Sequence, residues 1–508
     1  MRIACIHVPH LALQAVLRRD PERKDEAMAL AEGPSERARI LASNRRAYQA
    51  GVRPGQTVSQ ARSMAAGFLG GDHLVVHLPS PVDTTAATAT LCDVAFSFAP
   101  TVESESERAF LDVETLQGLY PQGEQAIVQA IAARAAAVGL AVRVAIASSK
   151  AVARVAAQVT DLTVVAPGQE RTFLAPLSVE TALSAGIPPV LGPEAKGLLP
   201  TLRRFGTPTL GAIAALPAAE LTLRLGRLGA FLHALAVGTA DEPFAPCLPP
   251  DALEEGTDIE YPLAEIEPLA FVLRGLVDRA LARLSCRGLA CAELSLRFKL
   301  DPQGFDVREV PLGAPTRETA TLLQLIRLDL ARRPPAAPIV GVTVRVLPAR
   351  VRATQMDFWR PAGPAPEKLA ATVARLSALV GPENVGAPAL VDTFREEAIA
   401  IRPYRYTEAA PIDSGAADGD ELALAFRRFR PPWPLEVLMD RDGPSALRGK
   451  QIVTRILVAA GPYRSSGNWW DEESFGRDYW DVHAADGAVY RLHQEKRSGE
   501  WFLDGYYD

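Results

Sequence analysis

Several features that mark other classes of protein are missing from this chain of 508 residues. No run approaches roughly 18 consecutive apolar residues, so no membrane-spanning helix is expected. The first residues lack the basic start, apolar stretch and small-residue cleavage site of a signal peptide. The five cysteines are scattered without a CxxC pair, which argues against a zinc site and favours a reduced compartment. Walker, GxSxG and HExxH motifs are absent too. We therefore expect a cytoplasmic protein outside these enzyme classes.

Basic charge is also scarce. The formal net charge is −6, and residues 251–350 hold 13 Lys and Arg against 14 Asp and Glu. Neutralising phosphates with Lys and Arg supplies most non-specific affinity for nucleic acid. Any DNA binding should therefore be weak. With 48% apolar residues, the chain can bury the cores of several domains.

The first part of the chain alternates strand and helix patterns. Apolar, β-branched Arg2–Val8 predicts a buried strand, and Leu11–Arg18 predicts a helix. A helical stretch at Ala42–Met64 is interrupted by a turn at Gly51–Gly55. The later elements expected are a strand at Phe110–Val113, a helix at Glu124–Val138, a strand at Leu140–Ala147 and a helix at Ser149–Val159. This order predicts an α/β domain up to about residue 165.

The patterns change twice further along. Lys196–Gly238 is helical throughout, with a tight turn at Gly206–Gly211. A small α+β module follows, with helices at Leu269–Leu284 and Thr319–Arg332 and strands at Ala292–Leu300 and Ile339–Val346. All six tryptophans lie after residue 350, among Pro-rich segments. The chain ends in a predicted strand meander at Tyr479–Ala484, Ala488–Gln494 and Glu500–Asp504.

Three stretches resemble the palm and fingers of Y-family DNA polymerases. They are IACIHVPHLALQAVL from Ile3, SESERAFLDV from Ser104 and VAIASSKAVARVAAQ from Val144. The helical segment resembles that family's thumb, and residues 258–347 resemble its little finger. The resemblance implies an α+β multidomain fold with a ferredoxin-like palm, fingers, a helical thumb and a little finger, plus a C-terminal β-rich extension. The expected domains are 1–165 (UmuC-like palm and fingers), 166–250 (thumb), 251–350 (little finger), 351–365 (linker) and 366–508 (partner-interaction region).

The family's metal ligands have no full counterpart here. Polymerase chemistry needs two metal ions about 4 Å apart, held by carboxylates. The resemblance places these ligands at Val8, Glu107 and Arg108. Valine binds no metal, and Arg108 adds a permanent positive charge. Because no Asp or Glu occurs from Arg2 to Arg19, the loss of the first ligand does not depend on the alignment register. We expect a pseudo-polymerase with no metal and no cofactor.

Neighbouring polar residues have two readings each. Three acidic residues alternate before a strand, namely Glu103, Glu105 and Glu107. They fit either a solvated edge of the sheet or the remnants of a metal-binding site. His7 and His10 fit packed or solvent-facing side chains better than metal ligands, because strand alternation does not aim both, with Cys5, at one ion.

The resemblance also suggests nucleotide or phosphate contacts. The fingers motif that touches the incoming nucleotide becomes NRRAYQAGV from Asn44, which offers Arg45 and Tyr48. Lys150 and Arg154 lie at basic positions of their motif, on one helix face, and fit either phosphate contacts or plain helix surface.

The turn Gly206–Gly211 resembles a helix–hairpin–helix element. Backbone N–H groups at the start of a helix bind phosphate, which makes Gly206, Thr207 and Gly211 candidates for contact with the DNA backbone. Helical hairpins with glycine turns are common, so a purely structural turn is the alternative.

A docking peptide follows the little-finger-like module. Gln355, Met356, Asp357, Phe358 and Trp359 resemble the bacterial sliding-clamp binding peptide, in which bulky apolar residues enter a pocket and Gln satisfies polar groups at its rim. The alternative is that Phe358 and Trp359 pack on the preceding domain.

The whole arrangement resembles the ImuB group of mutagenesis accessory proteins. The tail segments GPYRSSGNWWDEE, RDYWDV and WFLDGYYD extend the similarity to nearly the whole chain. The resemblance implies a cytoplasmic, nucleoid-associated adaptor in SOS-type mutagenesis. Its implied partners are the sliding clamp, an error-prone C-family polymerase, a RecA-like accessory protein and, weakly, damaged DNA, with no membrane. The tail tryptophans Trp469, Trp470, Trp480 and Trp501 are candidates for partner binding or for the core of the meander.

Two rival functions remain open. An active Y-family translesion polymerase with an altered metal site predicts template-directed nucleotide addition, and the residues at the ligand positions argue against it. A DNA-binding repair factor without clamp contact predicts a steep salt dependence, and the acidic balance argues against it.

Overall fold

The computed structural model describes residues 1–508 except 70–72, 196, 351–365, 394, 396–397, 403–424, 442 and 471–473. The chain divides into two compact units, Met1–Ala378 and Leu379–Asp508. None of the helices within the described ranges is long and apolar enough to cross a membrane.

The first unit begins with a five-stranded palm sheet in the order β5-β6-β1-β7-β8. Its strands are β1 (Ile3–His7), β5 (Val102–Glu105), β6 (Arg108–Asp112), β7 (Arg143–Ala147) and β8 (Leu162–Val164). Central β1 pairs antiparallel with both β6 and β7, and all its residues are buried. Such burial on both faces explains the continuous apolar run in its sequence. One face packs on α1 (Leu11–Arg19), α4 (Pro81–Phe96) and α5 (Glu124–Ala137), and the other on α6 (Lys150–Val159).

The fingers form a small separate core inserted after α1. The sheet order is β3-β2-β4, with β2 (Met28–Ala31), β3 (Ile40–Ser43) and β4 (Val75–His77). The helical stretch expected at Ala42–Met64 is two helices, α2 (Arg45–Gln49) and α3 (Val58–Leu69). Gly51 and Gly55 between them both have φ +89°, a conformation that favours glycine and ends the first helix. The core here consists mostly of alanines, which suits a compact module with little apolar area.

The thumb is a cluster of short helices that shares its core with α6. Its helices are α7 (Glu170–Leu174), α8 (Val179–Thr181), α9 (Gly192–Ala195), α10 (Leu198–Arg204), α11 (Leu210–Ala214) and α12 (Ala218–Val237). Gly186 permits a close approach between α6 and α12, because a Cβ there would lie 2.8 Å from a Val155 methyl group and 2.9 Å from one of Leu235. The thumb and palm are thus packed directly against each other through α6.

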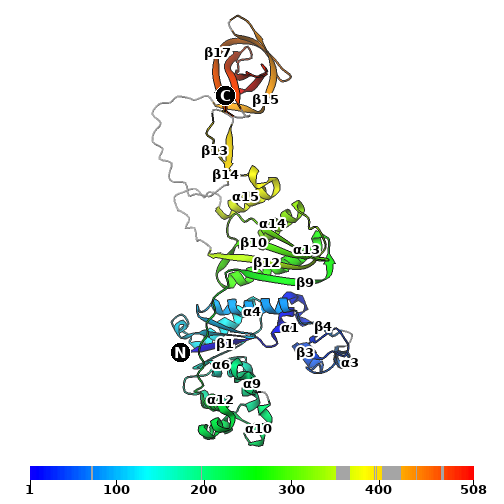
Figure 1. Cartoon of the computed structure of the whole chain (residues 1–508), viewed down its shortest axis with the longest axis vertical. Helices are drawn as coiled ribbons and strands as arrows, with labels where there is room; N and C mark the ends of the chain where they lie inside the picture. The colour runs from blue at the N-terminus through cyan, green and yellow to red at the C-terminus, as the bar shows by residue number, and fades with distance from the viewer. Residues whose placement is uncertain are drawn as a thin grey trace. The chain divides into compact units, whose positions relative to one another are not determined.

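The little finger is a four-stranded antiparallel sheet with helices on one face (Figure 1). The order is β11-β10-β12-β9, and the elements are β9 (Leu253–Leu263), α13 (Ile266–Cys286), β10 (Leu289–Leu300), β11 (Phe305–Val310), α14 (Thr319–Arg332) and β12 (Ile339–Arg350). A further helix, α15 (Pro366–Val380), places Ala374 in this core. From the sequence we predicted that the C-terminal region begins at residue 366. In the structure the first unit extends further, to Ala378, and includes most of α15.

Buried ion pairs fix the little finger to the palm. Glu255 of β9 accepts two hydrogen bonds from Arg18 of α1, at 2.8 and 2.9 Å, and one from Arg283 of α13 at 3.0 Å. Arg283 in turn reaches Asp93 of α4 at 2.7 Å. Burial would raise the pKa of Glu255, but the surrounding arginines outweigh it and lower that pKa. The carboxylate therefore stays ionised between the two modules.

The second unit is a hairpin followed by a closed barrel (Figure 1). The hairpin consists of β13 (Ala387–Leu390) and β14 (Ile399–Arg402). The barrel strands are β15 (Phe426–Met439), β16 (Pro444–Arg448), β17 (Val453–Gly467), β18 (Phe475–Ala484), β19 (Val489–Glu495) and β20 (Trp501–Tyr507). The predicted meander corresponds to the last three strands, and pairing of β15 with β20 closes the ring.

Candidate functional site

The end of the central palm strand carries the first of the predicted ligand positions. His7 lies directly opposite Arg108 of β6 and opposite Arg143 of β7, so the three side chains share one face of the sheet. Val8 instead packs in the core on the other face. The structure thus brings His7, not Val8, to the face of Arg108 and Arg143, while the assignment of a ligand position to Val8 stays a prediction. The inference drawn from it is unaffected, because histidine, like valine, supplies no carboxylate here.

The row Arg108–His7–Arg143 is positively charged and holds the end of α6. Arg108 donates to the side-chain oxygen of Gln158 at 3.2 Å, and Arg143 donates to the backbone oxygen of Gln158 at 2.6 Å. His7 is 3% exposed. Burial, reinforced by Arg108, lowers its pKa to about 4, so the imidazole is neutral near pH 7.

The row offers no site for a pair of metal ions. Of the predicted positions only Glu107 is acidic, and its backbone oxygen accepts from the Val8 N–H at 2.9 Å. Within the residues that the structure describes, no group of three or more His, Cys, Asp and Glu side chains is arranged to hold a metal. At Arg108, another of the predicted ligand positions, the side chain is a guanidinium, which carries a permanent positive charge and does not bind a metal ion.

Lys150 and Arg154 form a buried charge network rather than a surface. Lys150 Nζ is 2.6 Å from Glu103, and Arg154 is paired with Glu105 at 2.8 Å. Arg154 also donates to both oxygens of Glu242, at 2.7 and 2.9 Å. Both expectations for these cations, phosphate contact and plain helix surface, were wrong, because their charges are neutralised inside the protein.

The same network corrects the reading of the acidic edge. Glu103 is buried rather than solvated, with one oxygen bound to Lys150 and the other accepting from the Ala245 N–H at 2.9 Å. Burial lowers the pKa of Arg154, but its hydrogen bonds to the Glu242 and Glu105 carboxylates, with their negative charges, outweigh burial and raise that pKa overall. Sequence reasoning missed Glu242, which is 88 residues from Arg154 and carries no local motif. The network, made of Lys150, Arg154, Glu103, Glu105 and Glu242, joins palm to thumb.

The two fingers candidates lie on the surface. Arg45 is exposed, and Tyr48 is about half exposed. The guanidinium of Arg53 stacks 3.5 Å from the centre of the Tyr48 ring. Arg53, which the sequence reading did not select, thus covers one face of that ring, while Arg45 remains a prediction.

The glycine turn of the thumb has no free N–H groups at its predicted positions. Gly206 N–H donates to Arg203 O at 3.1 Å, Thr207 N–H to Leu202 O at 3.3 Å and Gly211 N–H to Ala175 O at 3.0 Å. The Thr207 hydroxyl donates to Leu202 O as well. The DNA-backbone role predicted for Gly206, Thr207 and Gly211 is therefore not supported, because the donors that a phosphate would need are already used.

The remaining candidates fall in two groups. Gln355, Met356, Asp357, Phe358 and Trp359 lie outside the described residues. In the tail, Trp480 and Trp501 pack against the barrel core, whereas Trp469 and Trp470 are 82% and 69% exposed. Their rings meet edge to face with centroids 5.5 Å apart. The four tryptophans thus divide into a core pair and a surface pair.

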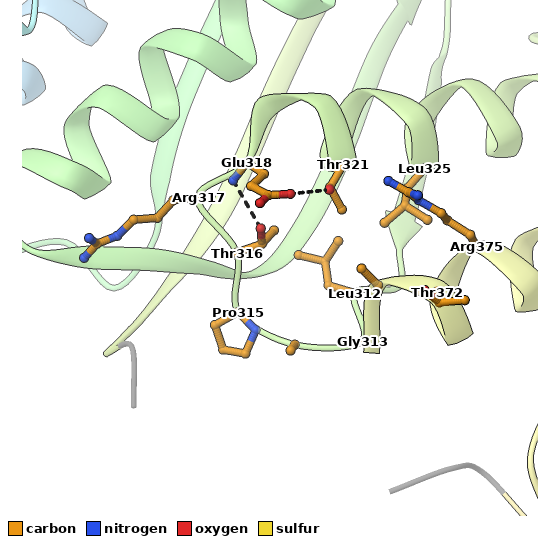
Figure 2. Close-up of a pocket in the computed structure, with 13 residues that line it drawn as sticks. Leu312, Gly313, Pro315, Thr316, Arg317, Glu318, Thr321, Leu325, Thr372 and Arg375 are labelled. Atoms are coloured by element: carbon orange, nitrogen blue, oxygen red, sulfur yellow. Dashed lines mark hydrogen bonds between the residues drawn. The ribbon is translucent and has the colours of Figure 1, made fainter. Parts of the chain in front are cut away.

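A pocket of about 560 Å³ lies on the little finger, where the loop before α14 meets α15 (Figure 2). Inside it the Thr321 hydroxyl donates to Glu318, and the Glu318 N–H donates to Thr316. All the lining residues come from positions 312–375, so none belongs to the palm. The pocket is separate from the row of His7 and the arginines.

Comparisons with known proteins relate this chain to one family and to several individual proteins. Residues 6–158 match the impB/mucB/samB family. Protein ImuB of Caulobacter vibrioides is 27% identical over 479 residues, which cover 90% of this chain and 99% of that protein. A DNA polymerase IV of Dehalococcoides mccartyi is 25% identical, covering 66% and 87% respectively. Among solved structures, a Dbh ternary complex matches 69% of this chain and 100% of its own, at 14% identity and TM-score 0.40. The resemblance to the ImuB group and the polymerase-like α+β fold class are confirmed.

Proposed function

We propose that this protein is a non-catalytic polymerase homologue that acts as an adaptor in DNA damage tolerance and induced mutagenesis. The observation that carries the proposal is the row Arg108–His7–Arg143 at the end of the palm sheet. Two metal ions need several hard carboxylate oxygens, and this row supplies two fixed cations instead. Similarity to ImuB over nearly the whole chain supports the same conclusion.

Clamp docking is the second element of the proposal. Gln355–Trp359 matches the pattern of a clamp-binding peptide and follows the little finger in sequence. A short peptide of this kind binds by burying a few bulky side chains in one pocket. The adaptor would thus be held at the replication fork without strong DNA affinity of its own, which agrees with the net charge of −6.

Partner recruitment is assigned to the second unit. The exposed pair Trp469–Trp470 offers large apolar area, and tryptophan is enriched among residues that dominate protein interfaces. Residues 379–508 contain 15 Lys and Arg against 22 Asp and Glu, a net charge of −7, which favours a protein partner over nucleic acid. The proposed partners are an error-prone C-family polymerase and a RecA-like accessory protein. An SOS-regulated, nucleoid-associated setting belongs to the same proposal.

The alternative function is an active Y-family polymerase with an altered metal site, for which Glu107 is the remaining acidic candidate. Both functions are tested on one preparation of the full chain. Purified sliding clamp is titrated against wild type, the triple variant Q355A/F358A/W359A and the control Phe305→Ala, which removes an aromatic that is 65% exposed on the little finger. Primer extension is measured with magnesium and with manganese.

The adaptor function predicts clamp binding that the triple variant loses and the control keeps, with no extension in either metal. Extension that disappears in Glu107→Gln would replace this proposal by the polymerase function. Clamp binding that survives the triple variant would move the docking site elsewhere. In a separate binding assay, W469A/W470A should lose the partner polymerase while keeping the clamp.

A further inference from the structure

The row Arg108–His7–Arg143 has a geometry suited to an anion. Direct pairing across β6, β1 and β7 puts all three side chains on the same face at the same end of the sheet. Neighbouring strands lie about 4.8 Å apart, so the three Cα atoms span only about 10 Å. Two guanidinium groups on such a base can converge on one small ligand.

The positive charge of this row is scarcely compensated. Within the described part of the chain, Arg108 forms no ion pair: its partner Gln158 is a neutral amide, and Glu105, directly opposite it on β5, is paired with Arg154. Arg143 touches Asp161 at 3.2 Å, but that carboxylate is 87% exposed. A solvated pair of this kind contributes little and is easily exchanged. The guanidinium groups thus retain charge and donors for another acceptor.

Two buried nitrogens in the row have no hydrogen-bond partner in the described structure. They are Nδ1 of His7, whose side chain is almost wholly buried, and Nε of Arg108. Buried polar atoms in folded proteins are nearly always satisfied, so unpaired ones indicate a missing partner. The Nε–H of Arg108 is a donor suited to an oxygen-rich anion, and Nδ1 of the neutral His7 can join it only in the tautomer that carries the hydrogen on that nitrogen.

We propose that this end of the palm sheet is a phosphate-binding site that needs no metal ion, with Arg108 and Arg143 as the anion ligands and His7 beside them. Guanidinium groups match phosphate oxygens through paired, charge-assisted hydrogen bonds. The phosphate comes either from a nucleoside triphosphate or from the DNA backbone. The site is independent of clamp docking, so its failure leaves the adaptor function untouched.

The test measures binding of two probes to the full chain in EDTA and in magnesium. The probes are dATP, followed by calorimetry, and a fluorescent primer–template duplex, followed by anisotropy. Arg108→Gln and Arg143→Gln are compared singly and together with Arg427→Gln, an exposed arginine of the barrel unit. Thermal unfolding of each variant establishes that it is folded.

We expect binding in EDTA that is unchanged by magnesium, weakened about tenfold by each single change and unaffected in the control. Binding of dATP alone identifies a nucleotide site, and binding of DNA alone identifies a backbone site. Binding that requires magnesium, or that persists in the double variant, overturns the proposal, as does the absence of binding to both probes. If the double variant unfolds, Arg108→Gln decides alone, with Arg108→Lys expected to retain most of the affinity.

Discussion

Two groups of cationic side chains lie at helix α6 of the palm, and they differ in whether acidic side chains neutralise their charge. Along the helix, Lys150 and Arg154 are paired with Glu103, Glu105 and Glu242. At its C-terminal end, Arg108 and Arg143 hold Gln158; Asp161, paired with Arg143, is exposed, and Glu105 opposite Arg108 is paired with Arg154 instead. The first group is buried and neutralised, whereas the second keeps its charge.

The difference separates structural from functional use of charge. A buried cation is tolerated only when acidic partners offset the free-energy cost of its desolvation. The resulting network of ion pairs connects the palm to the thumb. A half-buried cation without such a partner retains a positive potential that a ligand can use. Sequence similarity does not distinguish the two groups, because both lie within residues 6–158, which match a single family model.

The largest expected effect is on stability and concerns the neutralised group. Glu242→Ala leaves Arg154 buried with one acidic partner fewer, which should lower the free energy of unfolding of the first unit by about 3–5 kcal/mol. Arg108→Ala should cost less than about 1 kcal/mol, because within the described ranges its side chain forms one hydrogen bond, to the neutral amide of Gln158. Urea unfolding measures both.

The matched control for this comparison is Glu180→Ala, whose pair with Arg203 is exposed on both sides. Its effect should stay within about 0.5 kcal/mol. Equal losses in Glu242→Ala and Arg108→Ala would remove the distinction between the two groups.

A smaller effect is expected from acid and concerns His7. Its pKa is about 4 in the folded protein against 6.5 as the ordinary value, because of burial and the neighbouring arginines. Between these values the unfolded chain binds the additional proton. The stability that the neutral imidazole provides is therefore complete above pH 6.5 and lost as the pH falls toward 4, by at most about 3 kcal/mol.

The measurement is the slope of unfolding free energy against pH in that window. His7→Gln should flatten it, and exposed His10→Gln should not. Arg108→Gln should reduce it in part, since that guanidinium opposes protonation of His7. An unchanged slope in His7→Gln would assign the acid sensitivity to other groups.

Elements with strong local patterns were predictable from the sequence. The apolar run at β1 and the Ala-rich pattern at α5 depend on neighbours within a few residues, and both elements lie where they were expected. The register at the strand end was not predictable, since Val8 and His7 differ only in which face of the sheet they meet. A shift of one residue exchanges the two faces.

Contacts between residues far apart in the chain were the second feature that could not be predicted from the sequence. Glu103 and Glu105 alternate like a solvated edge, and only the arrival of Lys150 and Arg154 from α6 makes them buried partners. The meander was correctly read in its last three strands, but closure into a barrel depends on pairing between Phe426 and Tyr507, far apart in the chain. Local patterns carry no information on such contacts.

In the last prediction we expect no change in activity when carboxylates are introduced at the predicted metal-ligand end of the sheet. In H7D/R108E two carboxylates return to the end of the sheet, yet we expect no magnesium-dependent extension. The new Asp at position 7 would lie directly opposite Arg143 and form an ion pair with it instead of binding metal. Adding Arg143→Gln to the double variant removes this ion pair and frees the carboxylate at position 7. The sharper comparison is therefore between H7D/R108E and H7D/R108E/R143Q. The control is H7D/R108E/R427Q. Extension by the double variant would mean that Arg143 does not govern this site and that the two acidic positions alone separate the protein from a polymerase.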